Sequence, residues 1–287
     1  MRKLHIHLIP PNDTIYSQFL LPSLNLSSLH LTLDKVTALN LHAVAVNSSL
    51  LTDLSIIAPQ LQHVIGAINF PHLETLFLSM PELPITTEMI TPPQLTMQLV
   101  HLQGFKFSAY FSLHDIHADK LVMEDMTGPI TRLQGYPQNL TTFILSNTLV
   151  HSYSDLKLHL VPTLQTLSIT HTGLSYIYTN VLDYLPNLKH VNLSHNALTS
   201  FTLRPRQLPD LQILDLSDNR LTVLEQTLLL RPSLVAIHLQ NNLINNIESM
   251  AADFSFITVD ASLIDLSNNS LPCQCEMAIF LDYLTDS

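Results

Sequence analysis

The chain has 287 residues, of which 46% are apolar and only 12% are charged, and its formal net charge at pH 7 is −11. An acidic chain of this kind is a poor candidate for nonspecific binding to nucleic acid near neutral pH. The sequence contains no run of about 18 uninterrupted apolar residues, so it predicts no membrane span.

One apolar pattern recurs along the whole chain, and the first apolar residue of each unit marks its period. These positions are Met1, Leu26, Leu51, Leu73, Met97, Ala118, Leu140, Leu164, Leu188, Leu211, Leu234 and Ala261. In the clearest unit, Leu188 is followed by Val191, Leu193, Asn196 and Leu198. A period in the twenties with this spacing is typical of a leucine-rich repeat solenoid.

The period predicts an α/β fold: a horseshoe-shaped solenoid of about twelve repeats with a parallel β-sheet on its concave face. Each repeat would supply a strand of about three residues, a turn, and an irregular or short helical return. The leucines would stack into one continuous core, because no single repeat can bury its apolar side alone.

The position that Asn196 occupies divides the array into a regular and an irregular part. Asn219, Asn242 and Asn269 repeat it, and Thr148 and Thr172 replace it just before. An amide there can satisfy backbone groups that the turn leaves unpaired. Earlier units carry residues such as Phe105 and Met126 instead. We therefore expect irregular repeats over 1–139, regular repeats over 140–271, and a separate C-terminal segment over 272–287.

The first residues, MRKLHIHLIP, fit a repeat strand better than a signal peptide, because His5, His7 and the prolines interrupt any apolar stretch. We therefore expect the array to begin with a repeat and not with a cap. Terminal repeats normally carry a polar cap, so we expect this chain to be a fragment of a longer protein rather than a naturally capless form.

The two cysteines, Cys273 and Cys275, stand directly after the last repeat. A bond between them would be strained, so each would need a partner elsewhere, unless both are free thiols. A disulfide cap would imply an oxidising compartment. The segment 276–284 has the apolar spacing of a helix that covers the final repeat.

N-x-S/T sequons point to the same compartment. They lie at Asn12, Asn25, Asn47, Asn139, Asn192 and Asn268. Several would arise by chance in a chain rich in Ser, Thr and Asn. Together with the cysteine motif, they predict a glycoprotein that is extracellular, on the cell surface, or in the endosomal lumen.

The segments LPNLKHVNLSHNALTSF and LPDLQILDLSDNRLTVL resemble extracellular leucine-rich repeat proteins of animals. The ending NNSLPCQCEMAIFLDYL is similar to the start of their C-terminal cap, which implies that Cys273 and Cys275 bond to two later cysteines. Regular late repeats after irregular early ones resemble Toll-like receptor ectodomains. A repeat coil offers a long binding surface and no built-in chemistry, so we expect a binding function. The fold supports many functions, and the Toll-like role is therefore what the resemblance implies.

Catalysis is not expected. The sequence has no H-E-x-x-H, phosphate-loop or G-x-S-x-G motif, and it contains only five glycines. His5 with His7, and His114 with His117, have spacings that can bind metal, but strand or turn histidines explain them better. We expect neither a metal site nor a cofactor, and no enzymatic activity.

Variable residues between the leucines should face the open side of the sheet, because side chains alternate along a strand. In the late repeats they form a polar and acidic group suited to a polar or cationic partner. This candidate binding group comprises His190, Asn192, His195, Asp215, Asp218, His238 and Gln240. Fifteen histidines further suggest that binding to an anionic ligand strengthens in an acidic endosome.

The sequence thus predicts a binding ectodomain, most consistent with innate-immune pattern recognition of the Toll-like receptor type. A protein or microbial ligand would bind the concave or a lateral face, and a receptor dimer is a further expectation. Two alternatives stay open: a cell-adhesion or extracellular-matrix protein, and a cytosolic scaffold or inhibitor.

Overall fold

The structure is a computed structural model, and it describes most of the repeat array. The described residues are 3–8, 26–40, 50–66, 68, 70–84, 96–107, 113, 116–128, 130, 133, 135–247 and 264–271. The chain divides into two compact units, Met1–Leu149 (unit 1) and Val150–Ser287 (unit 2).

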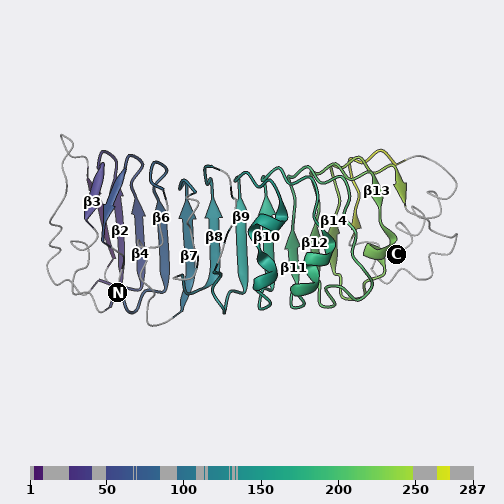
Figure 1. The fold of residues 1–287 in the computed structure, drawn as a ribbon, viewed down its shortest axis with the longest axis horizontal. Coiled ribbons are helices and arrows are strands. Elements are labelled where there is room, and N and C mark those ends of the chain that lie inside the picture. Colours follow the sequence, from purple (N-terminus) through teal and green to yellow (C-terminus); the bar gives the residue numbers. More distant parts are fainter. Residues whose placement is uncertain are drawn as a thin grey trace. The chain divides into compact units, whose positions relative to one another are not determined.

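Unit 1 contains seven parallel strands among its described residues, one from each successive repeat (Figure 1). In spatial order they are β1 (Lys3–Leu8), β2 (Ser28–Leu33), β4 (Asp53–Ile57), β6 (Thr75–Ser79), β7 (Met97–Gln103), β8 (Ala118–Glu124) and β9 (Thr142–Ser146). Two short strands of the return segments, β3 (Ala38–Asn40) and β5 (His63–Ile65), form a second small sheet.

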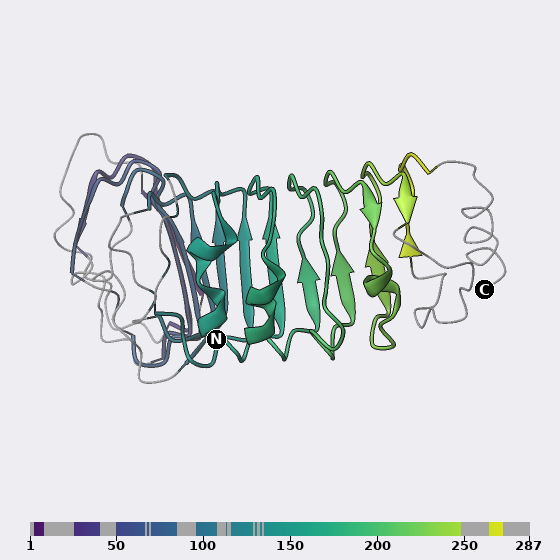
Figure 2. The ribbon, with the colours of Figure 1, turned by 45° about the vertical axis from the view of Figure 1, so that its right-hand side comes forward.

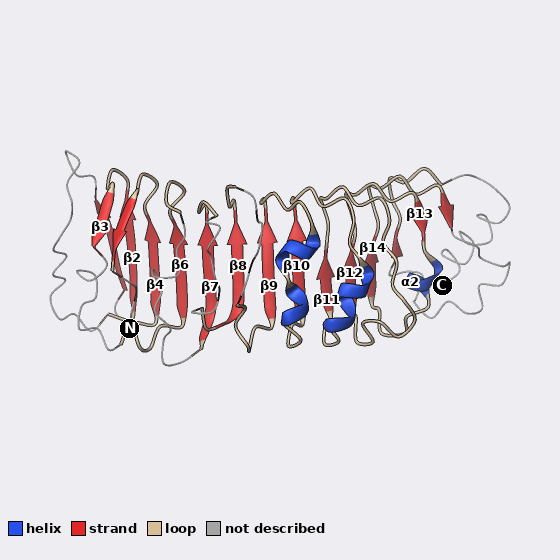
Figure 3. Cartoon of the chain, viewed as in Figure 1, coloured by secondary structure: helices blue, strands red, loops and turns tan. Residues whose placement is uncertain are grey.

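Unit 2 repeats this plan with shorter strands and more helix. Its described sheet contains β10 (Thr166–Thr170), β11 (His190–Asn192), β12 (Ile213–Asp215), β14 (Ala236–His238) and β16 (Ile264–Asp265). The return segments hold η2 (Tyr153–Leu156), η3 (Leu158–Leu160), η4 (Thr179–Tyr184), α2 (Gln226–Leu229) and the paired strands β13 (Val223–Leu224) and β15 (Asn246–Ile247). Figures 2 and 3 show these helices in the return segments, outside the sheet.

The strand register confirms the predicted repeat boundaries within both units. Ser28 pairs with Asp53 and Asp53 with Thr75, as Leu26, Leu51 and Leu73 predict. In unit 2, His190 pairs with Ile213 in the same way. The irregular early repeats therefore keep the predicted register despite their missing asparagines.

Strand length departs from the prediction of about three residues. The sheet strands of unit 1 contain five to seven residues, whereas β11, β12 and β14 contain three. In the regular repeats, Asn side chains occupy backbone carbonyls at the strand end: Leu193 O accepts from Asn196 and from Asn219. The Ile169 carbonyl on the five-residue strand β10 accepts from Asn196 in the same way, so this contact alone does not set the strand length.

The core contains the leucines that the pattern predicts. Leu188, Leu211 and Leu214 are fully buried, and Leu193 and Leu198 are at most 1% exposed. Burying each such side chain contributes about 2 kcal/mol relative to leaving it in water. Early repeats fill the asparagine position with apolar side chains, since Phe105 and Met126 are both buried.

In the repeats directly before the asparagines begin, threonine takes their position. The Met126 N–H donates to the Thr148 hydroxyl over 3.1 Å, and the same hydroxyl donates to the Ser146 carbonyl over 2.9 Å. Threonine thus performs part of the role of asparagine, as the sequence predicts.

Among the described residues, no helix is both long enough and apolar enough to cross a bilayer.

Candidate functional site

The sheet of unit 2 places a row of polar side chains on neighbouring strands. Asn192 pairs with Asp215, Asp215 with His238, and His238 with Asp265, on β11, β12, β14 and β16. These side chains are half-buried, except for Asp265, which is exposed. This strand row confirms the predicted alignment of Asn192, Asp215 and His238. Neighbouring parallel strands are about 4.8 Å apart, so the groups are close enough to act on one partner.

Local hydrogen bonds fix the orientation of the Asn192 and Asp215 side chains. Asn192 Oδ1 accepts from the Ser194 N–H over 2.9 Å. Asp215 Oδ1 accepts from the Ser217 N–H over 3.0 Å and from the Ser217 hydroxyl over 2.7 Å. One oxygen of each side chain is therefore committed to the turn. The Asn192 amide nitrogen and the second Asp215 oxygen remain for a partner.

Asp265 repeats the arrangement at the end of the row. Its Oδ1 accepts from the Ser267 N–H over 3.0 Å. This backbone hydrogen bond, with help from the Ser267 hydroxyl, lowers the pKa of the Asp265 carboxyl. The row consequently presents a carboxylate at its last position at neutral pH.

His195 and Asp218 belong to a second row, at the corner where each strand turns. The residues at this corner adopt left-handed backbone with φ between 54° and 57°; in unit 2 they are His171, His195, Asp218, Asn241 and Asn268. Asn, Asp and His tolerate this conformation better than other non-glycine residues. The predicted group therefore splits into the strand row and this corner row.

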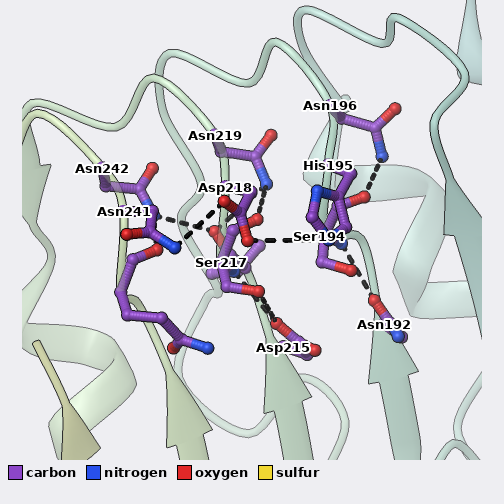
Figure 4. A network of polar contacts seen from close by, with 12 residues as sticks. Asn192, Ser194, His195, Asn196, Asp215, Ser217, Asp218, Asn219, Asn241 and Asn242 are labelled. Carbon is purple, nitrogen blue, oxygen red and sulfur yellow. Dashed lines mark hydrogen bonds and ion pairs between the residues drawn. The ribbon is translucent and has the colours of Figure 1, made fainter. Parts of the chain in front are cut away.

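Side chains of the corner row contact one another from repeat to repeat. The His171 and His195 rings stack with centroids 4.3 Å apart. His195 Nε2 lies 3.6 Å from Asp218 Oδ2, and Asn241 Nδ2 donates to Asp218 Oδ1 over 3.0 Å. Asn268 Nδ2 donates to Asn241 Oδ1 over 2.8 Å. Figure 4 shows Asp218 between the corners of the flanking repeats.

His190 and Gln240 lie outside both rows. His190 is exposed at the start of β11 and pairs with Ile213. Gln240 is half-buried, and its Oε1 is a buried atom without a hydrogen-bond partner. Ser194 and Ser217, at the position equivalent to Gln240, are buried, so this column is not the exposed surface that simple alternation predicts. The Ser217 hydroxyl donates to the Asp215 carboxylate within the same turn.

Unit 1 offers a more apolar face. Phe77 on β6 and His101 on β7 pack edge to face, with ring centroids 4.8 Å apart. Val122 on β8 is only 6% exposed. His101 Nε2 lies 3.0 Å from Glu124. At the corner, Asp125 Oδ2 accepts from Gln103 over 3.0 Å, and Asp125 Oδ1 accepts from Asn147. These two hydrogen bonds, led by that from Gln103, lower the pKa of the Asp125 carboxyl.

The remaining predicted sites are only partly within the described residues. Asn139 and Asn268 are exposed, and Asn192 lies on β11. Asn12, Asn25, Asn47, Cys273, Cys275 and His114 lie outside the described residues. Where the chain is described, no group of three or more His, Cys, Asp or Glu side chains is placed to hold a metal ion. His5 and His7 on β1 belong to no such group; His7 pairs with Asp34 over 2.6 Å.

Most of the corner row lies outside the binding group that the sequence predicts. His171, Asn241 and Asn268 are not in that group, yet they share the backbone conformation and the contacts of His195 and Asp218. The available signal was residue type: His, Asp or Asn stands directly before the asparagine, or the threonine that replaces it, at each of these corners. Those residues are enriched in left-handed backbone.

Comparisons with known proteins address the fold. The family described as "Leucine Rich repeats (2 copies)" matches residues 186–226. No curated protein matches the chain. Among solved structures, the mouse RP105/MD-1 complex has a TM-score of 0.55 at 15% identity and covers 86% of this chain and 51% of that chain.

Two further structures have lower scores. The TLR13-ssRNA13 complex has a TM-score of 0.48 at 17% identity, covering 86% of this chain and 44% of that chain. InlP of Listeria monocytogenes has a TM-score of 0.47 at 21% identity, covering 83% and 63%. The chain therefore spans about half the length of the TLR13 and RP105 chains. The repeat register, the buried leucines, the asparagine contacts and the family match agree: the chain is a parallel-strand solenoid with the leucine-rich repeat fold.

Proposed function

We propose that this chain is the binding part of an extracellular pattern-recognition receptor, and that the strand row of unit 2 contacts a protein partner. The observation that supports this most directly is the alignment of Asn192, Asp215, His238 and Asp265 on consecutive strands. A partner that lies across the strands would meet all four side chains without any change in the backbone.

The charges favour a cationic protein surface. Asp215 and Asp265 are acidic, and the whole chain has a net charge of −11. One oxygen of each carboxylate accepts a hydrogen bond from the backbone N–H of Ser217 or Ser267. Complementary charges of this kind speed association and select the partner more than they add affinity. RP105, which shares the fold, is in complex with the protein MD-1, and this supports a protein as partner.

Asp215→Asn tests the role of charge without disturbing the turn. Asn192, one repeat earlier, already accepts from Ser194 in the way that Asp215 accepts from Ser217. The asparagine variant should therefore fold normally while losing one negative charge from the row. Asp210→Asn, at an exposed site between β11 and β12, makes the same change in net charge and serves as the control.

The experiment measures binding of the purified chain to immobilised microbial products and to matrix proteins such as collagen and fibronectin. We expect saturable binding to at least one microbial product of protein type, about fivefold weaker for Asp215→Asn and unchanged for Asp210→Asn. Binding to matrix proteins alone would support an adhesion role instead. Equal affinity of both variants would remove the strand row from the binding site.

We further propose that the chain is exposed to an extracellular or endosomal compartment, as a glycoprotein with a disulfide-bonded C-terminal cap. The exposed sequons at Asn139 and Asn268 support this proposal, together with the Cys273–x–Cys275 motif. Expression with a secretion leader in animal cells tests it. Secreted chain that carries no glycan at Asn139 or Asn268 would contradict the assignment.

A further inference from the structure

A pocket of about 390 Å³ lies next to α2 in unit 2, away from the two rows described above. Pro209, Pro232 and Leu230 form much of its apolar wall, and Arg206, Thr227 and Arg231 supply polar groups. Its volume falls within the range of small-molecule sites, which are mostly apolar with a few well-placed polar groups.

Arg231 is an unusual residue for such a wall, because this charged residue is only 6% exposed. Nη2 donates to the Arg204 carbonyl over 2.9 Å, and Nη1 donates to the carbonyls of Gln207 and Leu208. No carboxylate among the described residues forms an ion pair with it. A buried charge that meets only neutral acceptors is costly, and burial lowers the pKa of this guanidinium.

Two polar atoms of the same wall have no hydrogen-bond partner. They are Arg231 Nε and Thr227 Oγ1, both of which are buried. Each unsatisfied buried group costs about 1–3 kcal/mol. Arg231 and Thr227 both line the pocket, so an acceptor that reached these two donors from the pocket would be stabilised.

The loop that holds the guanidinium is firmly organised. Asp183 pairs with Arg204 and accepts from Gln207 Nε2 over 2.7 Å, and the Arg204 N–H donates to Gln207 Oε1 over 3.0 Å. Leu208 is held in left-handed backbone with φ 50°, which is costly for a bulky side chain. The position of Arg231 is thus set before any ligand arrives, and such preorganisation reduces the cost of binding.

The geometry points to a binding site for a small amphiphilic anion, that is, a carboxylate or phosphate head group on a short apolar tail. The head group accepts hydrogen bonds from Arg231 Nε–H and the Thr227 hydroxyl, and it neutralises the buried guanidinium. The tail lies on Pro209, Pro232 and Leu230. Arg206, an exposed residue of the pocket wall, adds positive potential at the entrance. This site is independent of the partner proposed for the strand row.

Isothermal titration calorimetry of the full chain with octanoate tests the site. Octyl phosphate, neutral octanol and acetate are titrated in parallel. We expect saturable binding of octanoate or octyl phosphate, and the tighter of the two identifies the preferred head group. Octanol and acetate should bind at least tenfold more weakly, because each lacks one of the two parts that the pocket contacts.

Two conservative variants locate the binding. Thr227→Val keeps the side-chain shape and removes the hydroxyl, and it should weaken anion binding about fivefold. Arg206→Gln should weaken it about threefold. The matched controls, Thr222→Val and Arg220→Gln, change exposed residues that do not line the pocket and should alter affinity less than twofold.

A stability measurement separates binding from packing. Without ligand, Thr227→Val should unfold at the same or a higher urea concentration than the unmodified chain, because the variant has one fewer unsatisfied buried group. The proposal is overturned if no saturable binding occurs, if octanol binds as well as octanoate, or if both pocket variants bind octanoate like their controls. The outcome for the strand row is unaffected in each case.

Discussion

The side-chain amide of Asn219 joins its own repeat to the preceding one, because its Nδ2 donates to the Leu193 carbonyl over 2.9 Å. The same nitrogen donates to the carbonyls of Leu216 and Ser217, and Oδ1 accepts from the Leu198 N–H over 3.0 Å. One buried side chain thus satisfies four backbone groups. This explains why the pattern retains asparagine where the repeats are regular.

Asn219→Ala should lower the free energy of unfolding of unit 2 by about 3 kcal/mol, because the truncation leaves several buried backbone groups unpaired. Asn219→Thr should cost less, since Thr172 occupies the same position and donates to Asn196 Oδ1 over 2.8 Å. Urea unfolding followed by circular dichroism measures both. Arg220→Ala, at an exposed neighbour, is the control. A loss of less than about 1 kcal/mol for Asn219→Ala would contradict this role.

Left-handed backbone at the corner row predicts a strict preference for residue type. His195→Val should destabilise the chain by about 1–2 kcal/mol, because a β-branched residue is strained at φ 54°. His195→Asn should be within about 0.5 kcal/mol of the original, since Asn241 holds the same conformation further along the row. Thermal unfolding of the two variants makes the comparison, and equal midpoints would argue against strain at this corner.

Asp125 predicts a specific dependence of stability on acid. Its folded pKa lies below the ordinary value of 3.8, because Gln103 and Asn147 donate to the carboxylate. A group with a lowered folded pKa contributes stability above its unfolded pKa and loses that contribution as the pH falls through the folded pKa. We therefore expect the contribution of Asp125 to be complete at about pH 5 and to decline below about pH 4.

Carbon-detected NMR titration of the Asp125 carboxyl measures this pKa directly. Gln103→Ala removes the principal donor and should raise the pKa, with a smaller loss of stability between about pH 5 and pH 3 than in the unmodified chain. The control is Gln98→Ala, which removes a glutamine contact to Glu74 and leaves the hydrogen bonds of Asp125 intact. An Asp125 pKa at or above 3.8 in the unmodified chain would disprove the assignment.

Glycan mapping tests whether the strand row is accessible to a partner. Asn139 and Asn268 are exposed and should be occupied when the chain is secreted from animal cells. Asn192 should be unoccupied, because a glycan on β11 would cover its neighbour Asp215. Mass spectrometry of glycopeptides distinguishes the three sites. An occupied Asn192 would move the proposed contact away from this row.

Several features of the fold were predictable from sequence because they depend on spacing. The interval between Leu188 and Leu211 predicts that His190 pairs with Ile213, and it does. Strand length was not predictable: β10 and β11 come from successive repeats of the same pattern, yet they contain five and three residues. For the candidate site, alternation correctly placed Asn192, Asp215 and His238 in one row, but it put His195 and Asp218 beside them.

By itself, the sequence determined the solenoid. Residues that repeat with a fixed apolar period can be buried only when the repeats stack, so the period sets the strand register and the core. The tertiary structure decided what lies at the corners and between the repeats. Contacts such as His171 with His195, or Arg231 with the carbonyls of the preceding return segment, join residues more than 20 positions apart. They arise only when one repeat packs on the next, and the order of residues within a single repeat does not specify them.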